Sequence, residues 1–404
     1  MLSILNETRD THAPDVESQA PEIACVLLCA RTPFSEDHAR RLRAFAAAGL
    51  DWDRAIDFAF RHGLMPLLHL NVNATCPELV PPGPRARLRE QFRRTSALNL
   101  FLAAELRSLL EAFGARGVEA ILYKGPQLAD SAYGSLALRQ FYDLDLLVRK
   151  RDLPAVKEIM RGRGFVSHPD LGGGREEVIM RTQCNLTFAR DDNRTIVETH
   201  WDVCPTRFSP ALDAGSLWRR SREIDFRGVP ARALSPEDLL LALCVHGAKH
   251  VWERLGWVCD IAQLVNAQTA PDYQLVLERA RRGGAERMLL LGLALARDLL
   301  GARLPADLCE RLAARRDVRA LAASVNQLIF GGAGTAEGMS GYFSFQMRAR
   351  ERLREKMNYC RLALDPTDKD LASASLPRPL SFAYYLLRPL RLAVTGGPAQ
   401  FRQR

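Results

Sequence analysis

The spacing of apolar residues changes twice along the 404-residue chain, and this limits the folds that it can adopt. Apolar side chains recur at helical spacing over residues 20–73, and again over about 85–115 after a predicted linker or sharp turn at 77–84. Four short apolar runs follow at 118–123, 142–148, 183–189 and 195–201, and these predict strands. Helical spacing returns after about residue 232, where Ser235 and Pro236 provide a strong helix start.

This order predicts an α+β fold with a small mixed β-sheet core flanked by N-terminal and C-terminal helical domains. Within the core, a helix at 127–138 and another after Asp152 separate strands that are otherwise joined by hairpins. We expect four segments along the chain: a mobile tail at 1–19, an N-terminal helical domain at 20–115, an α/β core at 116–232 and a C-terminal helical domain at 233–404.

Composition excludes several classes of protein. Charged residues make up 25% of the chain and hydrophobic residues 47%, which is typical of globular proteins and excludes a disordered or low-complexity chain. The nine cysteines form no CxxC pair, acidic residues stand where a signal peptide needs basic ones, and no apolar run reaches the roughly 20 residues of a membrane span. We therefore expect a soluble, reduced, cytoplasmic protein with no membrane partner.

Two acidic residues in the second predicted strand are the first sign of chemistry. Side chains alternate between the two faces of a strand, so Asp143 and Asp145 share one face while the leucines between and after them enter a core. Adjacent carboxylates repel each other unless a divalent cation lies between them. In the last predicted strand Glu198 and His200 again share one face, so Glu198 would complete a three-carboxylate cluster that can bind Mg²⁺.

The turn after the first predicted strand suggests where a phosphate group would bind. Gly125 lets the backbone approach phosphate oxygens and exposes amide N–H groups at a helix start. Lys124, directly before this glycine, and Arg139 are candidates for neutralising phosphate charge.

Taken together, these segments resemble a known family. The Lys124-Gly125 turn, the stretch YGSLALRQFYDLDLLV at 133–148 and the later VETHW at 197–201 resemble the nucleotidyltransferase superfamily, which has the DNA polymerase β-like fold. More narrowly, the chain is similar to a group of bacterial nucleotidyltransferase family proteins, often encoded beside polysaccharide or peptide natural-product biosynthesis genes. The resemblance covers roughly 20–395 and includes the segments 246–260 and 385–391.

The resemblance implies roles for particular residues. Asp143 and Asp145 match the two metal-binding acids of the superfamily, and Glu198 matches the third acid, which positions or deprotonates the acceptor. Gly125 matches the glycine of the superfamily turn, but Pro126 stands where most relatives have glycine or serine. The implied activity is Mg²⁺-dependent transfer of an NMP from an NTP, with ATP the expected donor and Mn²⁺ the alternative metal.

The acceptor would be a hydroxyl or phosphate of an unidentified small molecule or peptide. Two alternatives remain open: a kinase-like phosphoryl transfer at the same metal site, and a non-catalytic nucleotide-binding or scaffold module. The formal net charge of +9 also keeps a nucleic-acid partner open, although its arginines are scattered among acidic residues, as on a solvated surface.

The segment 246–260 leaves three interpretations. His246 and His250 share a helix face at the spacing of paired metal ligands, or they pack against the sheet, or they lie at the nucleotide or acceptor. In the last case Lys249 or Arg254 would bind phosphate, with Asp260 orienting one of them.

Overall fold

The computed structural model describes residues 19–385 and 388, apart from 169–171, 173–174, 191–194, 206, 268–269, 332–338, 368–369, 372–375, 377 and 386–387. The predicted mobile tail at 1–19 lies outside the described residues except for its last position.

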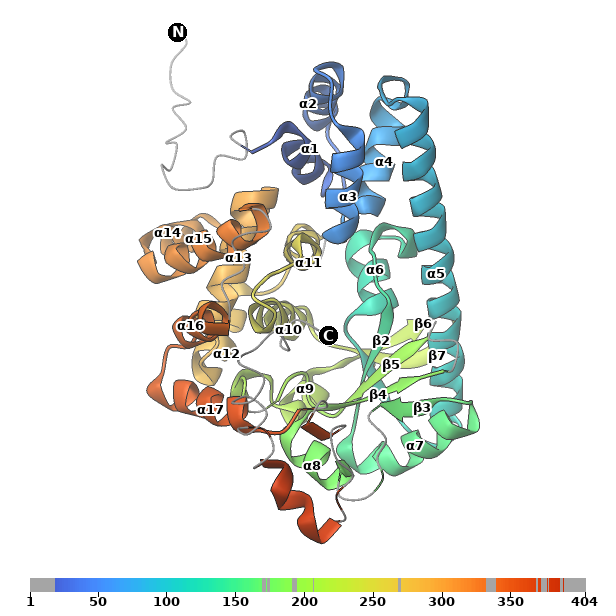
Figure 1. Ribbon diagram of the computed structural model, residues 1–404, viewed down its shortest axis with the longest axis vertical. Coiled ribbons are helices and arrows are strands. Elements are labelled where there is room, and N and C mark those ends of the chain that lie inside the picture. Colours follow the sequence, from blue (N-terminus) through green and yellow to red (C-terminus); the bar gives the residue numbers. More distant parts are fainter. Residues whose placement is uncertain are drawn as a thin grey trace.

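Five helices form the N-terminal part, and the fifth is by far the longest. They are α1 (Pro21–Cys29), α2 (Glu36–Ala47), α3 (Trp52–Arg61), α4 (Met65–Thr75) and α5 (Pro82–Gly114). Helix α5 runs along one side of the molecule, from the other N-terminal helices down to the sheet (Figure 1). The predicted linker at 77–84 is partly wrong, because a 3-10 turn at Pro77–Leu79 is followed at once by α5. Proline at the first position of a helix loses no hydrogen bond, so Pro82 begins α5 and does not prevent it.

A seven-stranded mixed sheet lies in the middle of the chain, in the order β3-β4-β5-β2-β1-β7-β6. The strands are β1 (Ala120–Leu122), β2 (Asp143–Val148), β3 (Val166–His168), β4 (Asn185–Ala189), β5 (Ile196–His200), β6 (Arg222–Phe226) and β7 (Val229–Ala233). The pairs β2–β5 and β1–β7 are parallel and the other pairs are antiparallel. The predicted mixed sheet is therefore confirmed, with β3, β6 and β7 added to the four predicted strands.

Short helices connect these strands. They are α6 (Gly125–Tyr133), α7 (Leu153–Gly162), α8 (Arg175–Thr182) and α9 (Ala214–Arg220), with 3-10 turns at Leu136–Leu138, Lys150–Asp152 and Pro210–Leu212. The helix predicted at 127–138 is shorter than expected, because Gly134 adopts a left-handed conformation that ends α6.

The C-terminal part is again helical. It contains α10 (Pro236–Lys249), α11 (Leu255–Asn266), α12 (Tyr273–Gly283), α13 (Glu286–Leu300), α14 (Ala306–Ala314), α15 (Arg316–Phe330), α16 (Met339–Ala349), α17 (Leu353–Leu364) and a 3-10 segment at Arg378–Ala383. The Ser235 hydroxyl accepts a hydrogen bond from the Asp238 amide at 3.3 Å, so the predicted helix start is confirmed.

The sheet separates two hydrophobic cores. Leu144, Leu146 and Val148 of β2 face a core shared with α5 and α7, whereas Leu147 faces a larger core. That larger core contains residues of α1–α4, of the sheet and of α10–α15, so one core includes parts of all three predicted domains. The domain boundaries themselves remain a proposal. No helix among the described residues is both long and apolar enough to cross a membrane.

Candidate active site

The acidic residues of β2 lie on the sheet face that carries the larger core. Asp143, Asp145 and Leu147 alternate with the leucines of the opposite face, and Leu147 is fully buried in that larger core. The two-residue repeat of a strand therefore places both carboxylates on one face, as the sequence predicted.

Strand β5 adds the third acid. It runs parallel to β2, with Asp145 opposite Glu198, Asp143 opposite Ile196 and Leu147 opposite His200. Side chains at directly paired positions of neighbouring strands lie close together, so the register brings Glu198 beside Asp145. Asp143 is the first residue of β2 and is less buried than the rest of that strand.

Two cationic side chains contact these acids. The Lys124 Nζ donates to Asp145 Oδ1 at 3.2 Å, and the His200 Nε2 lies 3.0 Å from the same oxygen. The His200 Nε2 also lies 3.2 Å from Glu198 Oε2. We call Asp143, Asp145, Glu198, Lys124 and His200 together the acid cluster.

Contact with Lys124 and His200 lowers the pKa of Asp145 and of Glu198. Burial by itself would raise the pKa of Asp145, but the charge of Lys124 and the hydrogen bond with His200 hold it well below its usual range. Burial is likewise outweighed at Glu198, where the hydrogen bond and charge of His200 lower the pKa. Both side chains are therefore ionised at neutral pH and available as ligands or acceptors.

The pKa of Asp143 shifts in the opposite direction. Burial, together with the negative charge of Asp145, raises the pKa of Asp143 to about 6. Without a bound metal ion, Asp143 is thus the acid whose charged form burial and the repulsion from Asp145 destabilise most. A divalent cation beside Asp143 would remove that repulsion, which is the behaviour expected of a metal ligand.

The turn after β1 lies against the start of β2. Gly125 has a φ of 52° in the left-handed region, and a Cβ at this position would lie 3.4 Å from the Asp143 carbonyl oxygen. Glycine suits this position because it adopts positive φ at little cost. Lys124 is the N-cap residue of α6, and its side chain makes no hydrogen bond to the backbone N–H groups at the start of this helix.

Arg139 lies in a buried ion pair. Its Nε donates to Asp260 Oδ1 at 2.7 Å and its Nη2 to Asp260 Oδ2 at 2.8 Å, while the Tyr133 hydroxyl donates to Asp260 Oδ1 at 2.7 Å. The expectation that Asp260 orients Lys249 or Arg254 is therefore wrong, because its carboxylate is held by Arg139 and Tyr133. Phosphate binding by Arg139 stays a prediction.

The charge of Lys124 acts on His246, near the C-terminal end of α10. Burial, followed by the positive charges of Lys124, His250 and Lys249, lowers the pKa of His246 well below its usual value. The ring of His246 lies 4.7 Å from that of His250, and both lie 5.2 Å from that of Trp257. Lys249 thus remains a candidate phosphate ligand, and the two histidines pack on Trp257.

The sequence patterns assign no role to two residues of this site, His200 and Tyr123. The alternation that places Glu198 also places His200 on the same face, so the signal is present in the sequence. Tyr123 is fully buried at the end of β1, its ring meets that of His200 edge-on at 6.0 Å, and among the described residues its hydroxyl has no hydrogen bond.

The cluster fits a divalent cation on its donor atoms. Asp145, Glu198 and His200 each offer a ligand atom within 4.8 Å of the others, and in the described part of the chain no other group of three such residues does. Carboxylate oxygens are the ligands that Mg²⁺ and Mn²⁺ prefer. Among the described residues His246 and His250 belong to no such group; their rings pack on Trp257, and a role at the nucleotide or acceptor stays a prediction.

One comparison with known proteins gives a match. Residues 48–301 match a family model described as an uncharacterised nucleotidyltransferase. The match is shorter than the resemblance expected over 20–395, but it includes the acid cluster, Arg139 and Lys249. No curated protein and no solved structure matches the chain.

Proposed function

The chain belongs to this nucleotidyltransferase family, and we propose that it transfers an NMP from an NTP, with ATP as the donor, in a reaction that needs Mg²⁺ or Mn²⁺. The observation that supports this most directly is the parallel register of β2 and β5, which aligns Asp145 with Glu198 and leaves Asp143 at the start of β2. The acceptor would be a hydroxyl or phosphate of a small molecule or peptide made in polysaccharide or natural-product biosynthesis.

In this proposal the site residues have different roles. Asp143, Asp145 and Glu198 would hold the metal, and Glu198, whose side chain is 27% exposed, would also orient or deprotonate the acceptor hydroxyl. Lys124 and the backbone at Gly125 would bind the triphosphate, with Lys249 and Arg139 as further candidates. A metal bound there supplies charge neutralisation for the triphosphate and the leaving pyrophosphate.

A kinase-like transfer at the same metal site is the second candidate, since the same acids would bind an NTP for either reaction. Labelled ATP distinguishes the two. We would offer ATP labelled at the α- or the γ-phosphate, with Mg²⁺ and a metabolite extract, and identify labelled products by mass spectrometry. Transfer of the α-label with release of pyrophosphate is expected, and transfer of the γ-label would contradict the proposal in favour of phosphoryl transfer.

The double variant with Asp143→Asn and Asp145→Asn tests the site in the same assay. It should form no labelled product, and calorimetry should show that it has lost Mg²⁺-dependent binding of an ATP analogue. A matched control is Asp317→Asn, which removes a carboxylate paired with arginines in the C-terminal helices. Equal product from the double variant and the wild type would mean that the site is elsewhere, and wild type that binds ATP without any transfer would indicate a non-catalytic module.

A further inference from the structure

We propose that His200, Asp145 and Glu198 form a second, inner metal site that takes a divalent transition ion such as Mn²⁺ in preference to Mg²⁺. The proposal rests on the proposed function, because it adds an inner ion to the same acid cluster that would hold the NTP-bound metal through Asp143.

The donor atoms already have the spacing of neighbouring ligands. The His200 Nε2 lies 3.0 Å from Asp145 Oδ1 and 3.2 Å from Glu198 Oε2. Two ligands at right angles around an ion with bonds of about 2.1 Å lie about 3 Å apart. A cation can therefore replace the proton that these atoms share without large movement of the strands.

The register of the strands gives the cluster an inner and an outer end. His200 pairs with Leu147, which is fully buried, whereas Asp143 pairs with Ile196 at the start of β5. The side chains of Asp145 and His200 are 5% and 7% exposed, against 27% for Glu198. An ion held by His200 would thus lie deeper in the protein than one held by Asp143.

Tyr123 provides an independent observation at the inner end. Its side chain is 1% exposed, and in the described part of the chain its hydroxyl has no hydrogen bond. The ring of Tyr123 meets that of His200 edge-on at 6.0 Å, and burial together with the charge of Asp145 raises the pKa of the phenol, so Tyr123 lies beside the cluster. A buried hydroxyl without a partner is costly, and water bound to an ion at the inner site would be an acceptor for it.

The imidazole determines which ion is preferred. Mg²⁺ prefers oxygen ligands in regular octahedral geometry and gives up its water reluctantly. Imidazole nitrogen suits transition ions, and Mn²⁺ is the transition ion that also suits carboxylate ligands. A site with two carboxylates and one imidazole, shielded from solvent, therefore favours Mn²⁺ over Mg²⁺.

Electron paramagnetic resonance tests the proposal on the full chain without nucleotide. Free Mn²⁺ is titrated into metal-free protein, with Mg²⁺ as competitor, and the bound ion is studied by electron spin echo envelope modulation. We expect coupling to ¹⁴N that changes to ¹⁵N coupling when the histidines carry ¹⁵N, together with Mn²⁺ affinity at least about 10-fold above that for Mg²⁺. This wild-type measurement does not depend on any variant folding.

The variant His200→Gln should lose the nitrogen coupling and bind Mn²⁺ about 10-fold more weakly or worse, while Mg²⁺ binding changes little. The matched control is His69→Gln in α4, whose ring stacks on Phe92 at 4.3 Å, and it should keep the coupling. Absence of nitrogen coupling in the wild type would overturn the proposal. So would a His200→Gln variant that binds both metals more tightly, because His200 would then be only a positive counter-charge.

These outcomes are separate from those of the proposed function. Nitrogen coupling without transfer of the α-label would leave the inner site in place and refute the NMP transfer. Transfer of the α-label with Mn²⁺ bound but without nitrogen coupling would support the NMP transfer and refute the inner site.

Discussion

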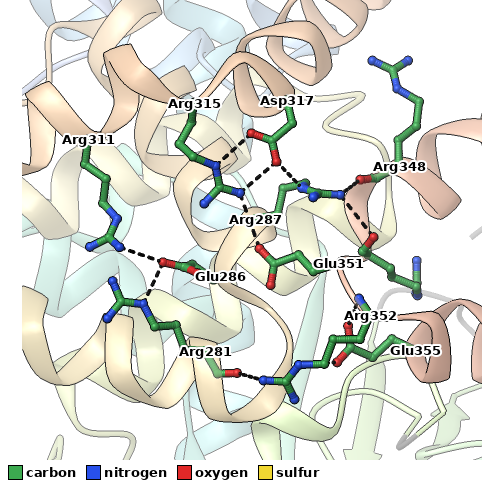
Figure 2. Close-up of polar contacts among 11 residues, drawn as sticks. Arg281, Glu286, Arg287, Arg311, Arg315, Asp317, Arg348, Glu351, Arg352 and Glu355 are labelled. Atoms are coloured by element: carbon green, nitrogen blue, oxygen red, sulfur yellow. Dashed lines mark hydrogen bonds and ion pairs between the residues drawn. The ribbon is translucent and has the colours of Figure 1, made fainter.

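Two dense groups of charged side chains occupy different layers of the molecule. The acid cluster lies on the sheet, and a second group ties α12–α15 to the segment around α17 (Figure 2). We call this second group the ion-pair network, and its members are Arg281, Glu286, Arg287, Arg311, Arg315, Asp317, Glu351, Arg352 and Glu355.

In the ion-pair network every carboxylate lies beside an arginine. Asp317 accepts from Arg287 at 2.7 Å and from both ends of the Arg315 guanidinium at 2.8 Å, and the hydrogen bonds of Arg315 lower the pKa of Asp317. In the acid cluster, by contrast, burial and the charge of Asp145 raise the pKa of Asp143 to about 6. A network with matched charges stabilises a fold, whereas a buried cluster with unmatched charge is suited to binding an external cation.

The largest expected effect is the loss of transfer in Asp145→Asn. Its carboxylate lies at the centre of the acid cluster, and the neutral amide cannot balance Lys124 and His200 or bind a metal in the same way. Formation of labelled product should fall by at least about 1,000-fold. The matched variant Asp317→Asn should keep wild-type activity, and an equal loss in both variants would mean that the two groups do not differ in role.

The next largest effect is expected for Asn99, an uncharged side chain that supports the segment before β2. The fully buried Asn99 of α5 donates to the carbonyls of Leu136 at 2.6 Å and Arg139 at 2.7 Å, in the segment that leads into β2. Asn99→Ala leaves these carbonyls unpaired and should lower the free energy of unfolding by about 2 kcal/mol, measured by urea denaturation. The exposed Asn73→Ala is the control, and the same loss there would contradict this account.

An effect of similar size but opposite sign is expected for Asp143→Asn in metal-free protein. Burial raises the pKa of Asp143 from 3.8 to about 6, so the folded state binds its proton more tightly than the unfolded chain does. Stability from this group is therefore present at low pH and is lost as the pH rises from about 4 to about 6.

At pH 7 Asp143→Asn should be more stable than the wild type by on the order of 2 kcal/mol, and at pH 4 the two should be alike. Thermal unfolding in EDTA at both values measures this, and added Mg²⁺ should reduce the difference. A variant less stable than the wild type at pH 7 would show that Asp143 is not destabilised by its neighbours.

The smallest effect is expected in the ion-pair network. Its partner arginines lower the pKa of Asp317, so this group stabilises the fold above about pH 3.8 and the benefit is lost as the pH falls through its folded pKa. The Asp317 side chain is 37% exposed, so solvent screens the pairs and Asp317→Asn should cost only about 1 kcal/mol at neutral pH. High salt should reduce this loss, and a loss that does not respond to salt would argue against ion pairing as its cause.

Local patterns predict the part of the site that depends on single strands. The alternation along β2 and β5 is enough to place Asp143, Asp145 and Glu198 on one face, since a strand repeats every two residues. Strands β3 and β6 escape prediction because they lie at the two edges of the sheet and contain charged or exposed residues, as in Arg222–Phe226. An edge strand needs less apolar surface, so its sequence signal is weak.

Contacts between segments that lie far apart in the chain cannot be predicted from the sequence alone. Arg139 and Asp260 are 121 residues apart, and nothing near either one indicates that Arg139 would take the partner expected for Lys249 or Arg254. The same holds for His200, whose nitrogen meets Asp145 across 55 residues. The chain by itself determined the helix and strand periods, the face on which the acids lie and the resemblance to nucleotidyltransferases, because these depend on local spacing. Only the tertiary structure decided which cation meets which acid, because that depends on strand register and helix packing over long separations.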